Sequence, residues 1–333
     1  MVKYIGDIKD YSEDDLRFAT PINVAKRRAK DLKCDRIVDL CSGIGIQACE
    51  FAKTCSRVLA IEIDSRKVEV SNKNFSNVKN LKFEVGDVMD EKIIEEVRNF
   101  NPDIIFCDPE RLASEKERNI ESIKPDLKRL IEVYGKICKN ICIEVPPRID
   151  LDKLKELDCE KEYLSLDNKL NRLNLKFGNL KRDGRSVVDV SSGMRIVDNS
   201  ERKAKENGKV LNYVYDVSEA VVKADLVDEL ACLIFARILK GCEKNKVLLT
   251  SKEPSLEFGC FAVPYNVIEI VYRFNYINKI LRTNGFGKAV IKYSIEPKNY
   301  WKDRNLLEKG LKGEREAVVF RVNNQFVICE FYD

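Results

Sequence analysis

Short apolar, β-branched runs alternate with amphipathic stretches over the first half of the chain. The runs predict strands at Arg36–Leu40, Arg57–Ile61, Leu81–Val85, Asp103–Cys107 and Asn140–Val145. The stretches between them predict helices at Ile46–Lys53, Ser65–Phe75, Glu91–Phe100 and Pro125–Lys136. Alternation of this kind is typical of βαβ units, whose strands are parallel. We therefore predict an α/β fold with a doubly wound parallel sheet.

The pattern changes after this sheet. Two alternating runs, Glu162–Leu166 and Leu170–Phe177, flank Asp167-Asn168-Lys169, which is typical of an antiparallel hairpin that closes the sheet at its edge. The charged, Gly- and Ser-containing segment Lys181–Gly208 indicates a linker.

Further along, helical spacing of apolar residues predicts a long helix in Val214–Leu239 and another in Val267–Arg282, within a small α+β region. Near the N-terminus, Thr20 as N-cap with Pro21 at the first helical position predicts the start of a basic helix.

One glycine turn carries candidate chemistry. The run Val38–Gly45 is a strand that holds Asp39 near its end and continues into a turn with Gly43 and Gly45, where the backbone lets a ligand approach closely. Glu62 ends the second strand, where a carboxylate accepts hydrogen bonds from ribose hydroxyls. Since Ala48 completes a G-x-G-x-x-A pattern, a dinucleotide is one candidate ligand.

The charge at this turn favours a different ligand. A carboxylate such as Asp39 repels a pyrophosphate and attracts the ammonium and sulfonium of S-adenosylmethionine. Asp87 and Asp108 follow the third and fourth strands, and the carboxyl ends of parallel strands share one edge of the sheet. A dehydrogenase would also need a proton relay, for which this chain has neither His nor Tyr-x-x-x-Lys, so a nicotinamide enzyme is the weaker alternative.

Composition narrows the chemistry further. The absence of His excludes His-based catalytic triads and His-containing zinc sites. The twelve Cys form no Cys-x-x-Cys pair and are expected to be reduced and mostly buried, so we expect no metal. No apolar run approaches the roughly 18 residues of a membrane span, and no signal peptide is evident, so we expect a cytoplasmic protein without a membrane partner.

The net charge of +4 does not by itself indicate nucleic acid. From Arg273 to Arg315, however, eleven Lys and Arg accompany four acidic residues, and Tyr276, Phe286, Tyr293, Tyr300 and Trp301 are interleaved with them. Such a segment offers partners to phosphates and to unstacked bases.

Several of these stretches resemble a known family. Residues 36–109 resemble class I S-adenosylmethionine-dependent methyltransferases, and the whole chain resembles the subfamily with a C-terminal THUMP-like domain. The stretches that carry the narrower resemblance are Ala19–Pro21 with Val24–Ala29, Asp108–Arg111, Val145–Asp150, Tyr213–Ala220, Lys279–Gly287 and Gly313–Glu330.

The resemblance implies a Rossmann-like methyltransferase sheet and assigns cofactor contacts. The methionine end is lined by Asp39, Ser42, Gly43 and Gly45; Glu62 holds the ribose, with Asp64 beside it; Asp87 and Val88 frame the adenine; Asp108 and Pro109 face the methyl group. It also implies three domains: an N-terminal helix and methyltransferase domain at 1–205, a small ferredoxin-like domain at 206–274 and a THUMP-like domain at 275–333.

The methyl donor is already activated, so alignment of the nucleophile and desolvation supply most of the catalysis. We expect Asp108 to orient the nucleophile and Arg111 to grip a phosphate or carboxylate. Glu110 and Arg111 replace the second Pro and the aromatic residue of the amino-methylating motif, so no ring is offered here to stack on a base.

We thus expect an RNA methyltransferase acting on tRNA or rRNA. Its expected substrate-binding residues are Arg27, Arg28, Arg282, Lys288 and Lys292. Two alternatives remain: a methyltransferase of a protein or small molecule, and a noncatalytic RNA-binding protein with a vestigial cofactor pocket. The sequence does not indicate the oligomeric state.

Overall fold

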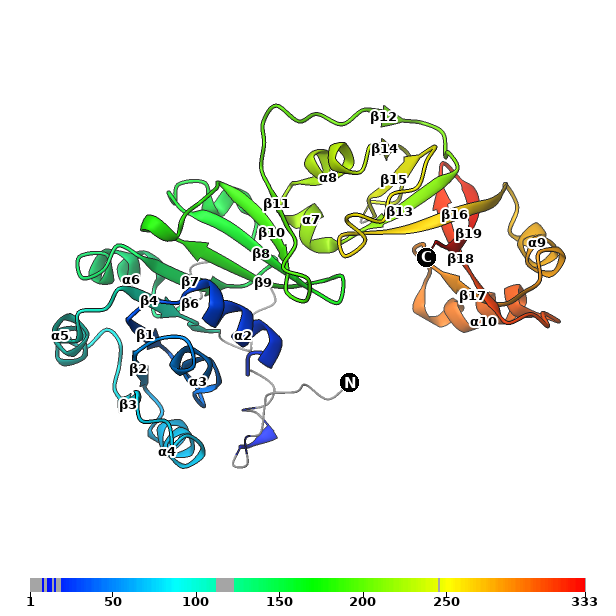
Figure 1. Cartoon of the computed structure of the whole chain (residues 1–333). Helices are drawn as coiled ribbons and strands as arrows, with labels where there is room; N and C mark the ends of the chain where they lie inside the picture. The colour runs from blue at the N-terminus through cyan, green and yellow to red at the C-terminus, as the bar shows by residue number, and fades with distance from the viewer. Residues whose placement is uncertain are drawn as a thin grey trace. The chain divides into compact units, whose positions relative to one another are not determined.

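The computed structural model describes residues 8, 11–13, 15, 19–111, 123–244 and 246–332, with only the backbone described at 110 and 111. The chain divides into two compact units (Figure 1). The first unit comprises Met1–Leu166 and Leu170–Arg195, and the second comprises Asp167–Lys169 and Ile196–Asp333. The three-domain division at 205 and 274 stays a prediction.

The first unit contains a nine-stranded sheet in the order β11-β10-β8-β9-β7-β4-β1-β2-β3. Its parallel strands are β1 (Arg36–Leu40), β2 (Arg57–Glu62), β3 (Leu81–Val85), β4 (Ile104–Cys107) and β7 (Ile141–Val145). The helices that connect them are α3 (Ile46–Ala52), α4 (Ser65–Asn74), α5 (Glu91–Phe100) and α6 (Leu127–Tyr134). The predicted doubly wound fold is confirmed, with element ends within two residues of expectation.

The predicted hairpin is formed by β8 (Glu160–Leu166) and β9 (Lys169–Lys176), and β9 runs antiparallel to β7. Asp167 and Asn168 turn the chain with φ of 52° and 59°, a conformation that Asp and Asn tolerate better than most residues. The hairpin does not end the sheet, because β10 (Arg185–Asp189) pairs in parallel with β8 and β11 (Arg195–Val197) lies beyond it.

The boundary predicted within Lys181–Gly208 agrees with the division between the two units at Arg195 and Ile196, but the segment is not a linker throughout, because β10 lies inside it. Ser186, Val187 and Val188 of β10 are fully buried, and the polar residues around them have partners inside the protein. Charge content misled the prediction because these charges are paired rather than solvated. Short elements complete the first unit: β5 (Glu110–Arg111), β6 (Ile123–Lys124), η2 (Leu151–Leu154) and η3 (Gly178–Leu180).

The N-terminal helix α2 spans Ile22–Asp31. Pro21, not Thr20, takes the N-cap position, and no side chain caps the helix, so the predicted cap was displaced by one residue. Ala29 packs in a core cluster with Ile37, Phe106 and Cys142, which places α2 on the sheet face that these residues share. Because alternate strand residues share a face, Asp39 and Glu144 lie on that face too.

The second unit contains an eight-stranded sheet in the order β12-β14-β15-β13-β16-β19-β18-β17. Its strands are β12 (Glu206–Asn207), β13 (Tyr213–Val217), β14 (Arg237–Leu239), β15 (Leu248–Ser251), β16 (Ala262–Val271), β17 (Phe286–Ile291), β18 (Arg315–Val322) and β19 (Gln325–Phe331). Its helices are α7 (Glu219–Lys223), α8 (Val227–Leu233), η4 (Phe274–Tyr276), α9 (Ile277–Thr283) and α10 (Pro297–Glu308).

Both long helices predicted here were wrong in extent. Val214–Leu239 is strand, two short helices and strand, because Ser218 caps α7 and Asp225, with φ of 56°, interrupts the helical path. Val267–Arg282 begins as β16, and only its last part is helical. In both segments β-branched residues satisfy a helical spacing but pair in a sheet.

The second unit has apolar clusters on both faces of its sheet. Val318 and Phe320 of β18 pack in one cluster with Val214 and Leu248, whereas Ala317 and Val319 pack in another with Ile277 of α9. Since neighbouring strand residues point to opposite faces, β18 contributes to two cores.

Candidate active site

The turn after β1 leaves the backbone open at one glycine and tightly packed at another. Cys41, Gly43 and Gly45 all have positive φ, at 62°, 58° and 79°. A Cβ built at Gly43 would meet nothing within 4 Å, whereas one at Gly45 would lie 2.7 Å from the Phe83 ring. The turn therefore presents accessible backbone at Gly43 while Gly45 permits packing at the start of α3.

Asp39 is a buried acid near the carboxyl end of β1. Its side chain is 1% exposed, and Oδ2 has no hydrogen-bond partner among the described residues. Burial raises its pKa well above the usual range, the charges of Asp108 and Glu62 raise it further, and Arg28 opposes them. Ser42 Oγ is likewise buried and unpartnered within the described part of the chain. Because an unpaired buried carboxylate is costly, this pair of atoms fits a cationic, hydrogen-bonding ligand.

Glu62 is held in place at the end of β2. The amides of Gly43 and Asp64 donate to its two carboxylate oxygens at 2.8 and 3.1 Å. Each oxygen keeps a lone pair that is able to accept a further hydrogen bond. Asp64 instead caps α4, accepting from the amides of Arg66 and Lys67 at 2.9 and 3.4 Å.

A side chain within the turn after β3, that of Asp87, stabilises this turn. Asp87 Oδ1 accepts from the amide of Met89 at 2.8 Å. Val88 is buried, and its carbonyl accepts from the Tyr134 hydroxyl at 2.6 Å. Sequence reasoning missed Ile63 and Val85, which are 62% and 47% exposed beside the ends of β2 and β3. Exposed apolar side chains at two neighbouring strand ends offer the kind of surface that a purine ring packs against. The sequence signal was an apolar residue at or just beyond the end of each strand.

Asp108 and Pro109 follow β4. The amide of Asp108 donates to the carbonyl of Leu40 at 3.3 Å, which holds the loop beside the glycine turn. The side chain of Arg111 lies outside the described residues. Cys107 is buried, and desolvation together with Cys41, Asp108 and Asp39 raises the pKa of its thiol, so it remains a neutral core residue.

Comparisons with known proteins agree with this geometry. Residues 34–190 match the sequence model of a family described as RNA cap guanine-N2 methyltransferase. A crystal structure described as "putative methyltransferase from Porphyromonas gingivalis W83" superposes with a TM-score of 0.80 and 17% identity, covering 98% of this chain and 84% of that one.

Residues 34–190 are thus similar in sequence to a methyltransferase family, and the first unit has a Rossmann-like methyltransferase fold. Its cofactor is S-adenosylmethionine. Two further structures superpose less well, each with a TM-score of 0.34. One is a methyltransferase from Geobacter sulfurreducens, with 15% identity over 47% of this chain and 77% of that chain. The other is a "putative RNA methyltransferase" from Pyrococcus horikoshii, with 17% identity over 52% of this chain and 91% of that chain.

No helix among the described residues has the length and apolar character to cross a membrane.

The methyltransferase domain buries one of the cations that were expected to bind substrate. Arg28 of α2 is 2% exposed, so its predicted direct role in substrate binding was wrong. Its guanidinium donates to Gln47 at 2.8 Å, to Asn174 at 3.3 Å and to Glu144. The neighbouring Arg27 is half-buried and pairs with Asp31 at 2.9 Å. Sequence alone offered no signal for this difference, since both are basic residues of one helix.

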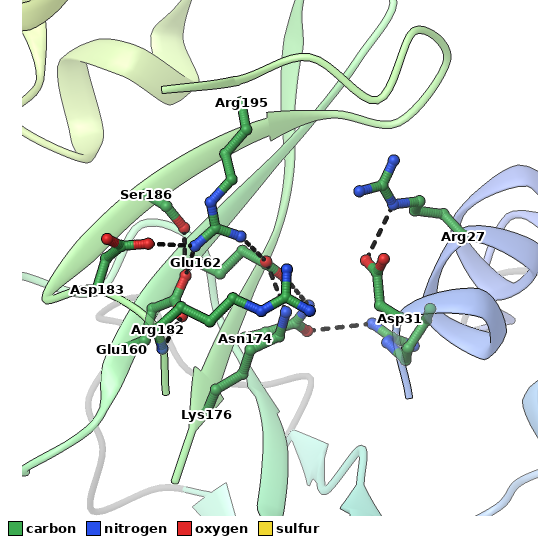
Figure 2. A network of polar contacts seen from close by, with 11 residues as sticks. Arg27, Asp31, Glu160, Glu162, Asn174, Lys176, Arg182, Asp183, Ser186 and Arg195 are labelled. Carbon is green, nitrogen blue, oxygen red and sulfur yellow. Dashed lines mark hydrogen bonds and ion pairs between the residues drawn. The ribbon is translucent and has the colours of Figure 1, made fainter. Parts of the chain in front are cut away.

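A second buried network supports the antiparallel part of the methyltransferase sheet (Figure 2). Lys176 pairs with Glu162 at 2.6 Å, and Arg195 reaches Glu160, Glu162 and Asp183. Although burial opposes ionisation, Lys176, Asn174 and Arg195 lower the pKa of Glu162. This network holds together the strands whose charges had indicated a linker.

The expected substrate-binding residues of the second unit differ in exposure. Lys292 is half-buried, donating to Asp216 at 2.8 Å and to the Tyr265 hydroxyl at 3.0 Å, so its ammonium is already engaged within the chain. Arg282 and Lys288 are exposed. Arg282 Nε makes a long contact of 3.5 Å to the carbonyl of Gly310.

Proposed function

We propose that this protein is an RNA methyltransferase, in which the first unit transfers the methyl group and the second unit binds RNA. The observation that carries the proposal is the match of residues 34–190 to a family described as RNA cap guanine-N2 methyltransferase. Exposed cations of the second unit add support, because phosphate contacts dominate nucleic-acid affinity.

The proposed cofactor contacts follow from the unpartnered atoms of the site. Asp39 and Ser42 receive the methionine end, where the cofactor's ammonium would neutralise the buried carboxylate. Glu62 accepts from the ribose hydroxyls, and Asp87 with Val88 frames the adenine. The cofactor, when bound, supplies a methyl group activated by a sulfonium. Everything else required of the chain is binding, orientation and exclusion of water.

Asp108 is the residue we assign to the nucleophile. It follows β4 at the same sheet edge as Asp39 and Glu62, and its charge acts on both Asp39 and Arg28. In the proposed step, Asp108 accepts a hydrogen bond from the nucleophile and orients it toward the methyl group. Arg111 stays a proposed ligand of a substrate phosphate.

RNA binding is assigned to a basic surface that we define by Lys279, Arg282, Lys309 and Lys312. All four are exposed, and none forms an ion pair among the described residues. Asn278 Nδ2 donates to the carbonyls of Leu307 and Lys309 at 2.7 and 3.0 Å. This contact holds α9 against the loop after α10, which brings the four cations onto one region.

The proposal is tested by incubating the full chain with labelled S-adenosylmethionine and RNA from a strain that lacks the gene, followed by nucleoside mass spectrometry. We expect label in one modified nucleoside, and none with Asp108→Ala. The modified nucleoside also identifies the atom, which distinguishes a guanine-N2 product from others. Label confined to protein or metabolite fractions would overturn the RNA assignment, and RNA binding without cofactor binding would overturn the enzymatic one.

A further inference from the structure

The most deeply buried arginine of the first unit's described residues lies at the site rather than on the surface. Arg28 reaches four elements from α2: Gln47 of α3, Glu144 of β7, Asn174 of β9 and the ring of Phe106 in β4, whose centroid is 4.4 Å from Cζ. Burying a guanidinium is costly unless it is compensated, so a buried position on an otherwise basic helix requires a specific partner.

Glu144 alone does not account for this cation. Glu144 is also contacted by Arg172, whose Nε lies 2.5 Å from Oε1. Two arginines thus share one carboxylate. Asn174, which accepts from Arg28, also donates to Glu162, so this group is joined to the second network, in which three carboxylates accompany two cations.

Arg28 also lies beside the cofactor edge of the sheet. Asp39 pairs in register with Phe106, the residue whose ring lies under the Arg28 guanidinium. The charged groups that act on Asp39 are Asp108, Glu62 and Arg28, and Arg28 is the cation among them. Asp108 acts in turn on Arg28, together with Glu144 and Cys142. Asp39 therefore lies on the strand next to Phe106, over whose ring the guanidinium sits.

We propose that Arg28 is a positioning residue for methyl transfer, whose guanidinium favours the anionic form of Asp39 against the cost of burying that carboxylate. This inference rests on the role proposed for Asp39. Burial disfavours charge on Arg28, but Glu144, Cys142 and Asp108 raise its pKa, so the cation persists. In this proposal Arg28 acts on the reaction through Asp39.

The test compares Arg28→Gln with Arg172→Gln. Each variant removes one cation from Glu144 and leaves the other in place, so their effects on the packing of Glu144 are matched. Calorimetric titration with S-adenosylmethionine from pH 5 to 9 measures affinity. For Arg28→Gln we expect the affinity for S-adenosylmethionine to fall by about tenfold. The midpoint of its pH dependence should shift upward, because the pKa of Asp39 rises when the Arg28 cation is removed. For Arg172→Gln we expect both to stay as in the wild type.

Arg28→Lys provides the check on folding. It keeps the charge but not the planar fork that bridges Gln47, Glu144 and Asn174. We expect the pH midpoint to return toward the wild type even where thermal stability does not. Three results would overturn the proposal. The first is a folded Arg28→Gln variant whose cofactor affinity and pH midpoint match the wild type. The others are an equal loss of affinity in Arg172→Gln, and a pH midpoint in Arg28→Lys that equals that of Arg28→Gln.

These readouts use the cofactor alone. If the wild type binds S-adenosylmethionine but methylates no RNA, the proposed substrate fails while the Arg28 experiment stands. If Asp39→Asn leaves affinity unchanged, the proposed role of Asp39 fails, and the Arg28 inference fails with it.

Discussion

Charge is used in opposite ways in the two units. In the first unit, Asp39, Glu144 and Arg28 are buried, and Arg28 donates to Glu144 and opposes the raised pKa of Asp39. On the basic surface of the second unit, cations such as Lys279 and Lys312 are exposed and have no ion pair among the described residues. Buried charges are poorly screened and set protonation states, whereas exposed ones act as a salt-sensitive attraction for an anionic partner.

The largest effect on turnover is expected from a substitution of Asp108. Asp108→Ala should lower kcat by about 10³-fold, because it removes the group that orients the nucleophile. Cofactor affinity should change by less than about tenfold, or roughly 1.4 kcal/mol. Single-turnover kinetics and calorimetry separate the two. If Asp108→Ala retains turnover, Asp108 has no role in the mechanism, and the acids of the site serve only to bind the cofactor.

The next effect is on the cofactor. Asp39→Asn should weaken S-adenosylmethionine binding by about 30- to 100-fold, since a hydrogen bond to a charged group contributes about 2–3 kcal/mol. Asp64→Asn is the matched control: Asp64 lies two residues after Glu62 but caps α4, and Asn is an equally good cap. Equal losses in both variants would show that the turn, not the buried charge, governs binding.

The pKa of Asp39 predicts a pH dependence. Its folded-state pKa is raised by burial and by Asp108 and Glu62, with Arg28 opposing. Cofactor affinity should therefore rise with pH through that pKa, by up to about tenfold per pH unit, and level off above it. The unliganded protein should show the reverse sign: the contribution of Asp39 to stability is present below its unfolded pKa and lost as pH rises through the folded one. Asp39→Asn should flatten both curves in calorimetry and thermal melts, and persistent slopes would point to another group.

The smallest effect per residue is expected on the second unit. Replacing Lys279, Lys309 and Lys312 with Ala should weaken RNA binding and make the plot of log affinity against log salt shallower, by about 0.7 for each phosphate that a lysine no longer neutralises. A matched variant, Lys298→Ala, removes a lysine that is already paired with Glu296 at 2.9 Å and should change the slope little. Nitrocellulose filter binding at several salt concentrations measures both. Equal slopes would mean that the exposed cations are not the RNA surface.

Local patterns were sufficient where a strand or helix met its neighbour in chain order. The parallel strands from Arg36–Leu40 to Ile141–Val145 and the helices between them were predictable because hydrophobic alternation and crossover length are properties of short segments. The same patterns failed at Arg185–Asp189 and Val214–Leu239. There, charged residues were buried by pairing and β-branched residues joined a sheet, outcomes that depend on partners distant in the chain.

The sequence by itself determined the doubly wound sheet, the glycine turn and the row of acids at the strand ends, because each follows from residue type and spacing within a βαβ unit. Only the tertiary structure decided which charges lie inside. Arg27 and Arg28 are adjacent and chemically identical, yet one pairs at the surface of α2 and the other lies buried over Phe106 beside Glu144. Burial depends on what the rest of the chain packs against a residue, and burial determines whether its charge binds a partner or controls a neighbour's proton.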